Sequence, residues 1–315
     1  MINPHRFAEL IHSRMPGDAT LEAVVPEHDH GCRAGRPAPA AIRGDGPAGS
    51  IVIISDCHLG TAACHAHRLL AFLEKIAPRT LIINGDLCDI GSCWRGHWPA
   101  AHRAVIQRLL EMADQGTTIR YIVGNHDAGL LNWCHLTLPN IHLHRRLIID
   151  LGGVRTLIMH GDACDSSLGN HRLLWRCAGW LHDRVACFSS RLDRLQERCG
   201  WRPRSLLGGI KSAVPQVRSY IDRFHQSAAA YAAGLGCVAV ICGHIHQPVV
   251  RCLDTPQGRV RYLNVGDWIE HCSALVWNGH DWDMTMDRVP AAQARPAAAS
   301  GEALARAASC PLPAA

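Results

Sequence analysis

The chain has 315 residues, of which 48% are hydrophobic and 19% are charged, and this is enough for one large α/β domain with additional segments. Its 15 cysteines are an odd number in a long chain and form no C-x-x-C pair, whereas a disulfide scaffold would be short and evenly paired, so reduced thiols in a cytoplasmic protein are expected. No apolar run approaches the roughly 20 residues that span a bilayer, so a membrane-spanning helix is not expected. The net charge of +5 comes almost entirely from arginine, which suits phosphate ligands, although the base composition of the genome would give the same bias.

Both ends of the chain differ in composition from the middle. Residues 1–50 combine a short amphipathic start with several prolines among glycine and alanine, which predicts a flexible N-terminal extension. Residues 288–315 are rich in alanine and proline and are expected to be a disordered tail. The sequence therefore predicts that the folded domain occupies residues 51–287.

Strands and helices alternate in the first half of this domain. Short β-branched runs predict strands at 51–54, 80–83 and 118–123, and helical periodicity predicts helices at 66–76 and 102–113. This order indicates a sheet with crossover helices, and therefore an α/β fold. Strands predicted at 146–151 and 154–160 flank Gly152-Gly153, a hairpin signal.

A helical insertion with many arginines and several aromatic residues is predicted at 166–235. We expect it to be a cap over a substrate, with apolar and basic faces that suit acyl chains and a diphosphate or anionic lipid headgroups. The alternative is a packed helical pair with a solvated basic face, and nucleic-acid binding is a weaker third reading. Further strands are predicted at 237–242, 248–253, 259–265, 274–277 and 282–286.

Five polar clusters follow predicted strands, and they contain Asp, Asn and His. They are Ser55–His58, Asn84–Asp89, Gly124–Asp127, His160–Asp162 and Gly243–His246. Ligands in open α/β sheets collect at the carboxyl ends of strands, so the clusters can converge on one crevice. In the Asp-x-His and His-x-His pairs, an extended chain would place both side chains on one side. Each cluster alone could be an ordinary turn or surface feature, but five in this order predict a metal centre with oxygen and imidazole ligands.

In this order the residues resemble the calcineurin-like metallophosphoesterase superfamily, over residues 51–287. The finer resemblance is to bacterial UDP-2,3-diacylglucosamine pyrophosphatase-like proteins of lipid A synthesis. It rests on the sequence segments 85–110, 121–127, 159–165, 241–251 and 262–276. The resemblance implies a four-layer αββα sandwich with an inserted helical cap.

The resemblance also implies a set of site residues. One metal would take Asp56, His58 and His246. The other metal would take Asn125, His160 and His244, and Asp86 would bridge the two. His126 would stabilise the phosphoryl charge or donate a proton, and Asp89 would orient His126. The two divalent ions would be manganese, with magnesium, iron and zinc as alternatives.

Two departures bear on the substrate. Protein phosphatases of the superfamily have an arginine where this chain has Ile90, which disfavours protein dephosphorylation. Enterobacterial pyrophosphatases resemble G-N-R-D where this chain has His126, so the match is to a histidine-bearing branch.

The implied reaction is hydrolysis of the diphosphate of UDP-2,3-diacylglucosamine to UMP and 2,3-diacylglucosamine 1-phosphate. The partner would then be a nucleotide-linked glycolipid, met at the inner face of the cytoplasmic membrane, and nucleic acid is not expected. The alternatives are a metallophosphodiesterase or phosphatase with another nucleotide or lipid substrate, or a non-enzymatic scaffold, which the intact ligand set opposes. Candidate substrate contacts are Trp94, Trp98, Arg172 and Arg176.

Other residues near the motifs are expected to be structural. Asp127 is predicted to accept hydrogen bonds rather than bind metal. The Asn264, Gly266, Asp267 and Trp268 turn is expected to be structural, with Asn264 as a support for His246.

Overall fold

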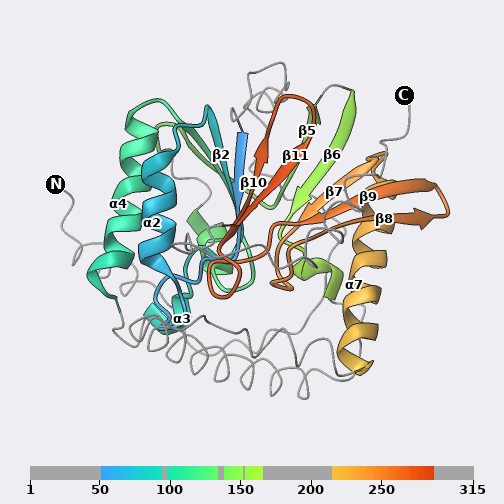
Figure 1. Cartoon of the computed structure of the whole chain (residues 1–315), viewed down its shortest axis with the longest axis horizontal. Coiled ribbons are helices and arrows are strands. Elements are labelled where there is room, and N and C mark those ends of the chain that lie inside the picture. The colour runs from blue at the N-terminus through green and yellow to red at the C-terminus, as the bar shows by residue number, and fades with distance from the viewer. Residues whose placement is uncertain (1–50, 94–97, 134–137, 152, 166–214, 287–315) are drawn as a thin grey trace, which may run out of the picture. The chain divides into compact units, whose positions relative to one another are not determined.

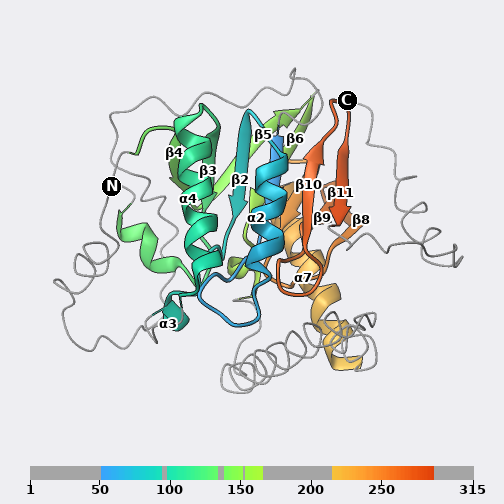
Figure 2. The same ribbon diagram turned by 60° about the vertical axis from the view of Figure 1, so that its left-hand side comes forward.

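The computed structural model describes residues 51–93, 98–133, 138–151, 153–165 and 215–286 (Figures 1 and 2). Two β-sheets pack face to face, and helices cover their outer faces, which confirms the predicted αββα sandwich. The expectations for residues 1–50, 288–315 and most of the cap lie outside the described residues.

The first sheet has six strands. Their order is β11 (Trp282–Met286), β10 (Ser273–Trp277), β1 (Ile51–Ile54), β2 (Thr80–Asn84), β3 (Thr118–Ile122) and β4 (Ile141–His144). Strands β1 to β4 are parallel, and crossover helices α2 (Ala66–Lys75) and α4 (Ala100–Asp114) join the first three. Leu69 and Leu73 of α2 and Val105 and Leu109 of α4 are buried against this sheet. The predicted helix–strand alternation is therefore confirmed.

The second sheet has five strands. Their order is β5 (Arg146–Leu151), β6 (Val154–Met159), β7 (Ala239–Cys242), β9 (Gly258–Asn264) and β8 (Val249–Thr255). The β5–β6 hairpin is antiparallel as predicted, whereas β6, β7 and β9 are parallel. Helix α7 (Pro215–Gly234) covers the outer face, with Phe224, Ala228 and Ala232 buried. The last 20 residues or so of the predicted cap interval thus form a layer of the sandwich, and the cap stays a prediction for 166–214.

The core between the sheets explains the continuous apolar strands. Ile51 and Ile53 point to the second sheet, while Val52 and Ile54 point to the helices, so β1 is buried on both faces. Parallel strands covered on both faces read as unbroken hydrophobic runs. Strand β4 was not predicted, because its sequence, IHLH, is too short and too rich in histidine to give that signal.

Seven of the described cysteines are free, as expected for reduced thiols. Cys252 is disulfide-bonded, so that expectation is wrong for this residue. None of the helices in the described segments is long and apolar enough to span a bilayer.

Candidate metal centre

The five polar clusters meet at one end of the sandwich. They follow β1, β2 and β3 of the first sheet and β6 and β7 of the second, and the strands within each group are parallel neighbours. Their carboxyl ends therefore lie side by side, with the two groups facing each other across the sandwich. The structure brings all seven candidate metal ligands together there.

The first candidate set is compact. His246 Nε2 lies 3.2 Å from Asp56 Oδ1 and 3.3 Å from His58 Nε2. One atom from each of these three residues falls within 4.8 Å of the others. Asp56 is fully buried and His58 is 5% exposed. This set can surround one cation.

The second candidate set gathers around an amide oxygen. Asn125 Oδ1 lies 3.1 Å from His160 Nε2 and 3.0 Å from His244 Nδ1. Asp86 Oδ2 lies 3.3 Å from His160 Nε2 and 3.7 Å from His58 Nε2. The Asp86 carboxylate therefore stands between the two sets, where a bridging ligand would be.

The backbone of the ligands differs from the extended chain that the spacing suggested. Five candidate ligands have left-handed φ angles between 48° and 68°: Asp56, His58, Asp86, His244 and His246. The chain turns sharply after each strand, and the turn, rather than a strand-like alternation, brings both members of each pair to the site. Non-glycine residues adopt this conformation at a cost of roughly 1–2 kcal/mol, and it persists where the surroundings impose it.

Glycines make the close approach of the clusters feasible. A Cβ atom at Gly124 would lie 2.3 Å from Asp86 Oδ1, and one at Gly243 would lie 2.4 Å from Asp56 Oδ2. Each glycine directly precedes a candidate ligand of its own cluster. The side chain of any other residue would therefore displace a ligand that belongs to a different cluster.

The charges of the site suit a divalent cation. Burial alone would raise the pKa of Asp56, but the His246 imidazole holds it below its usual range. Burial would likewise lower the pKa of His160, but the Asp86 carboxylate raises it to about 10. Burial, and then His246, lowers the pKa of His58 to about 4, so that imidazole is neutral and its nitrogen can bind a metal. Buried carboxylates that imidazoles face, one of them neutral and one holding a proton that a cation could replace, are a set that a metal ion would satisfy.

Comparison with known proteins agrees with this site. A sequence model described as calcineurin-like phosphoesterase matches residues 49–248, which is more than half of the chain. The chain belongs to the calcineurin-like phosphoesterase family. It is thus a metal-dependent hydrolase, and the family implies divalent metal ions.

Two relatives illustrate the similarity within this phosphoesterase family. A UDP-2,3-diacylglucosamine hydrolase of Porphyromonas gingivalis is 26% identical over 253 residues, covering 73% of this chain and 94% of that protein. The hydrolase of the same name from Nitrosococcus oceani is 31% identical over 244 residues, covering 70% and 88%. Among solved structures, Vacuolar Protein Sorting 29 from Cryptosporidium parvum aligns with 12% identity and a TM-score of 0.36, covering 77% of this chain and 98% of that one.

Hydrogen bonds orient the candidate ligands of this phosphoesterase. His160 Nδ1 lies 2.9 Å from the Asn84 carbonyl oxygen, which can only accept, so Nδ1 donates and Nε2 is left for a metal. The Asn264 side chain, which was expected to support His246, donates through Nδ2 to the Gly243 carbonyl at 2.6 Å. The residue that faces His246 is Asp267, with Oδ2 3.8 Å from Nδ1. Sequence reasoning missed this contact.

His126 and Asp89, the two predicted catalytic residues, lie beside each other. His126 Nδ1 lies 3.0 Å from Asp89 Oδ2, and the His126 ring lies beside the His58 ring, with centroids 4.7 Å apart. Burial would raise the pKa of Asp89, but hydrogen bonds from His126 and Ser92 hold it well below its usual range. An ionised Asp89 keeps a proton on Nδ1 of His126, whose ring is 37% exposed at the edge of the site.

The remaining predicted residues divide into two groups. Asp127 accepts hydrogen bonds from Tyr121 Oη and from the backbone N–H groups of Leu87 and Gly124, so it joins β3 to the Asp86 cluster as a structural acceptor. Trp98 was predicted as a candidate substrate contact, but it packs against the core and the His102 ring, which favours a packing role. Trp94, Arg172 and Arg176 lie outside the described residues.

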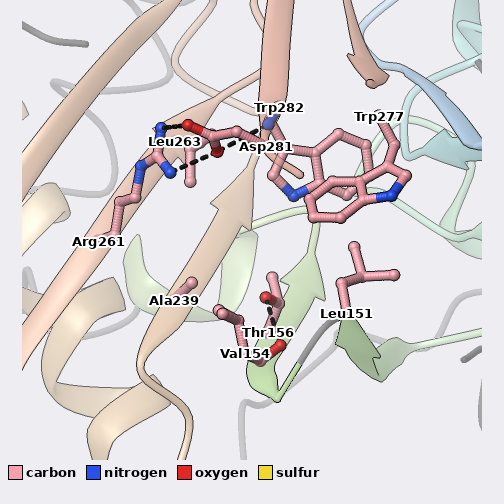
Figure 3. Close-up of a pocket in the computed structure, with 9 residues that line it drawn as sticks. All are labelled: Leu151, Val154, Thr156, Ala239, Arg261, Leu263, Trp277, Asp281 and Trp282. Atoms are coloured by element: carbon pink, nitrogen blue, oxygen red, sulfur yellow. Dashed lines mark hydrogen bonds and ion pairs between the residues drawn. The ribbon is translucent and has the colours of Figure 1, made fainter. Parts of the chain in front are cut away.

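A small pocket between the sheets contains none of the candidate ligands (Figure 3). Leu151, Val154 and the indoles of Trp277 and Trp282 line it, and Arg261 pairs with Asp281 at its side, with Nη2 2.9 Å from Oδ2. The indole centroids are 5.4 Å apart. This pocket is part of the packing between the sheets.

Proposed function

We propose that the chain hydrolyses the diphosphate of UDP-2,3-diacylglucosamine, with two divalent ions held by the seven candidate ligands. The observation that carries the hydrolytic part is the position of Asp86, whose Oδ2 lies between His58 and His160 of the two sets. Asp56, His58 and His246 would hold one ion, and Asn125, His160 and His244 the other. We propose that both ions are manganese.

The chain's own residues have distinct tasks in this proposal. When bound, the ions would polarise the phosphoryl oxygens and acidify the attacking water. The backbone N–H of His126 donates to Asp86 Oδ1 at 2.8 Å, which fixes the bridging carboxylate. The His126 side chain, held by Asp89, would donate a hydrogen bond or a proton to an oxygen of the reacting phosphate.

The choice of substrate rests on the relatives and on Ile90. The proteins named UDP-2,3-diacylglucosamine hydrolase match over 88–94% of their own lengths. Ile90 offers no charge to a phosphate, unlike the arginine of the resembling protein phosphatases. The sugar-linked lipid would be met at the inner face of the cytoplasmic membrane, under a cap formed by residues 166–214. A metallophosphodiesterase or phosphatase acting on another nucleotide or lipid is the second candidate.

The test is release of UMP from UDP-2,3-diacylglucosamine in detergent by the full chain with MnCl₂. We expect UMP and the lipid 1-phosphate as products, and no product from Asp86→Ala protein. UDP-glucose serves as a matched substrate without acyl chains and is expected to react far more slowly. Turnover of bis-p-nitrophenyl phosphate without release of UMP from the lipid would reject this substrate and favour the second candidate.

A further inference from the structure

The segment from Asn264 at the end of β9 to Ser273 at the start of β10 contacts the candidate metal centre although it contains none of the predicted ligands. We call it the support loop. Its Asn264 side chain donates to the Gly243 carbonyl at 2.6 Å, and the Trp268 backbone N–H donates to the Asp56 carbonyl at 3.1 Å. It lies beyond residues 49–248, the range matched by the family model. The support loop thus reaches both segments that carry the first candidate set.

Asp267 is the centre of the support loop. Its side chain is fully buried, and Oδ1 accepts three backbone N–H groups, from Ile269 at 2.8 Å, Glu270 at 2.5 Å and His271 at 3.1 Å. These bonds fix the carboxylate. The second oxygen, Oδ2, accepts from His271 Nδ1 at 2.8 Å and lies 3.8 Å from His246 Nδ1.

His246 therefore has different neighbours at its two ring nitrogens. Nε2 faces Asp56 Oδ1 at 3.2 Å and His58 Nε2 at 3.3 Å, inside the first set. Nδ1 faces the Asp267 carboxylate. A carboxylate beside one ring nitrogen favours the tautomer with the proton there and leaves the other nitrogen as the metal ligand.

We infer that Asp267 is a positioning residue, which fixes the ring orientation and tautomer of His246 for metal binding. This inference rests on the ligand assignment in the proposed function, and it is independent of the lipid substrate. A carboxylate in this position also makes the ligand nitrogen more basic, and partners of this kind change metal affinity by about 10- to 100-fold in other sites. The alternative is that Asp267 only closes the loop through its three backbone bonds.

The variant Asp267→Asn separates the two roles, because an amide keeps one oxygen for the backbone N–H groups and removes the charge. The measurement is calorimetric titration of MnCl₂ into metal-free full-length protein, without substrate. We expect one of two sites to bind about 10- to 100-fold more weakly and the other to be unchanged. The visible spectrum of the Co²⁺-loaded variant should also shift. Asp281→Asn is the matched control, because Asp281 pairs with Arg261 rather than with a candidate ligand, and it should keep both affinities.

Wild-type Mn²⁺ affinities and an unchanged Co²⁺ spectrum in Asp267→Asn would overturn the inference and leave only loop closure. If that variant does not fold, the Zn²⁺-loaded wild-type protein still tests it through ¹H–¹⁵N spectra of the histidine rings. We expect a proton on Nδ1 of His246 and a metal-bound Nε2. The opposite arrangement would overturn the inference. Neither measurement uses a phosphoester, so a wrong substrate in the proposed function would not affect either result.

Discussion

Gly124→Ala tests whether the clusters interlock as the structure indicates. The added Cβ would lie 2.3 Å from Asp86 Oδ1, 3.0 Å from Asp86 Cγ and 2.8 Å from the Asp86 backbone nitrogen. Carbon and oxygen atoms in contact are normally separated by more than 3 Å, so one of the two segments must move by about 1 Å. A displacement of this size at a reacting centre reduces activity by about 100-fold, equivalent to about 2.7 kcal/mol of transition-state stabilisation. Overpacking should also lower the free energy of unfolding by about 1–3 kcal/mol.

The assay is hydrolysis of bis-p-nitrophenyl phosphate with MnCl₂, below the melting temperature of both proteins. Gly124 has no left-handed φ, so the substitution tests steric contact alone. Gly234→Ala is the matched control, because it lies at the end of α7 with no atom within 4 Å of the added Cβ, and we expect activity within about 2-fold. Near-normal activity of Gly124→Ala would refute the close approach of the Gly124 and Asp86 clusters.

Two further predictions concern acid–base chemistry and stability. Asp89→Asn should lower kcat by about 10²- to 10³-fold while Mn²⁺ affinity changes by less than about 3-fold, since Asp89 holds His126; steady-state kinetics and calorimetry check this. Burial, followed by Arg251, lowers the pKa of His225 from 6.5 to about 4. Because this pKa is lower in the folded state, the unfolded chain binds a proton at His225 more tightly than the folded chain does. The free energy of unfolding is therefore unaffected by protonation of His225 above about pH 6.5. It decreases as the pH falls towards 4, by at most about 3 kcal/mol. Urea unfolding of wild type and His225→Phe at pH 7 and 4.5 measures this; an equal loss in both proteins would contradict it.

The parallel strands and their crossover helices could be predicted because the strands are buried on both faces, whereas the four-layer sandwich was implied by the family resemblance. The runs at 51–54 and 80–83 contain no polar interruption, and α2 and α4 show clear apolar periodicity, so local patterns were sufficient. The predicted cap interval, 166–235, includes helix α7. The apolar periodicity of this helix indicates that one face is buried, but it does not indicate which surface covers that face. Only the packing of Phe224 and Ala228 against the second sheet assigns α7 to a layer.

The polar clusters could be predicted from residue type and order, and the individual ligands from the family resemblance, whereas their backbone and their supports could not be predicted. The left-handed φ angles depend on hydrogen bonds between clusters that are distant in sequence, such as Asp56 N–H to the Gly85 carbonyl at 3.1 Å. Asp267 is similarly separated from His246 by 20 intervening residues, and an Asp in a turn after a strand usually caps the turn itself. A signal was present, because Asp267 follows β9 as the other clusters follow their strands.

The left-handed ligands show how the site is held together. Five such residues at roughly 1–2 kcal/mol each would require about 5–10 kcal/mol, which is comparable to the whole stability of a typical domain. The opposing interactions come from other clusters: His58 N–H donates to the Asp86 carbonyl at 2.9 Å, and His244 N–H donates to the Asp56 carboxylate at 3.1 Å. Each strained segment is therefore stabilised by a segment that carries another ligand. For this reason the five clusters form one cooperative unit, and the geometry of either metal set depends on the backbone of both sheets.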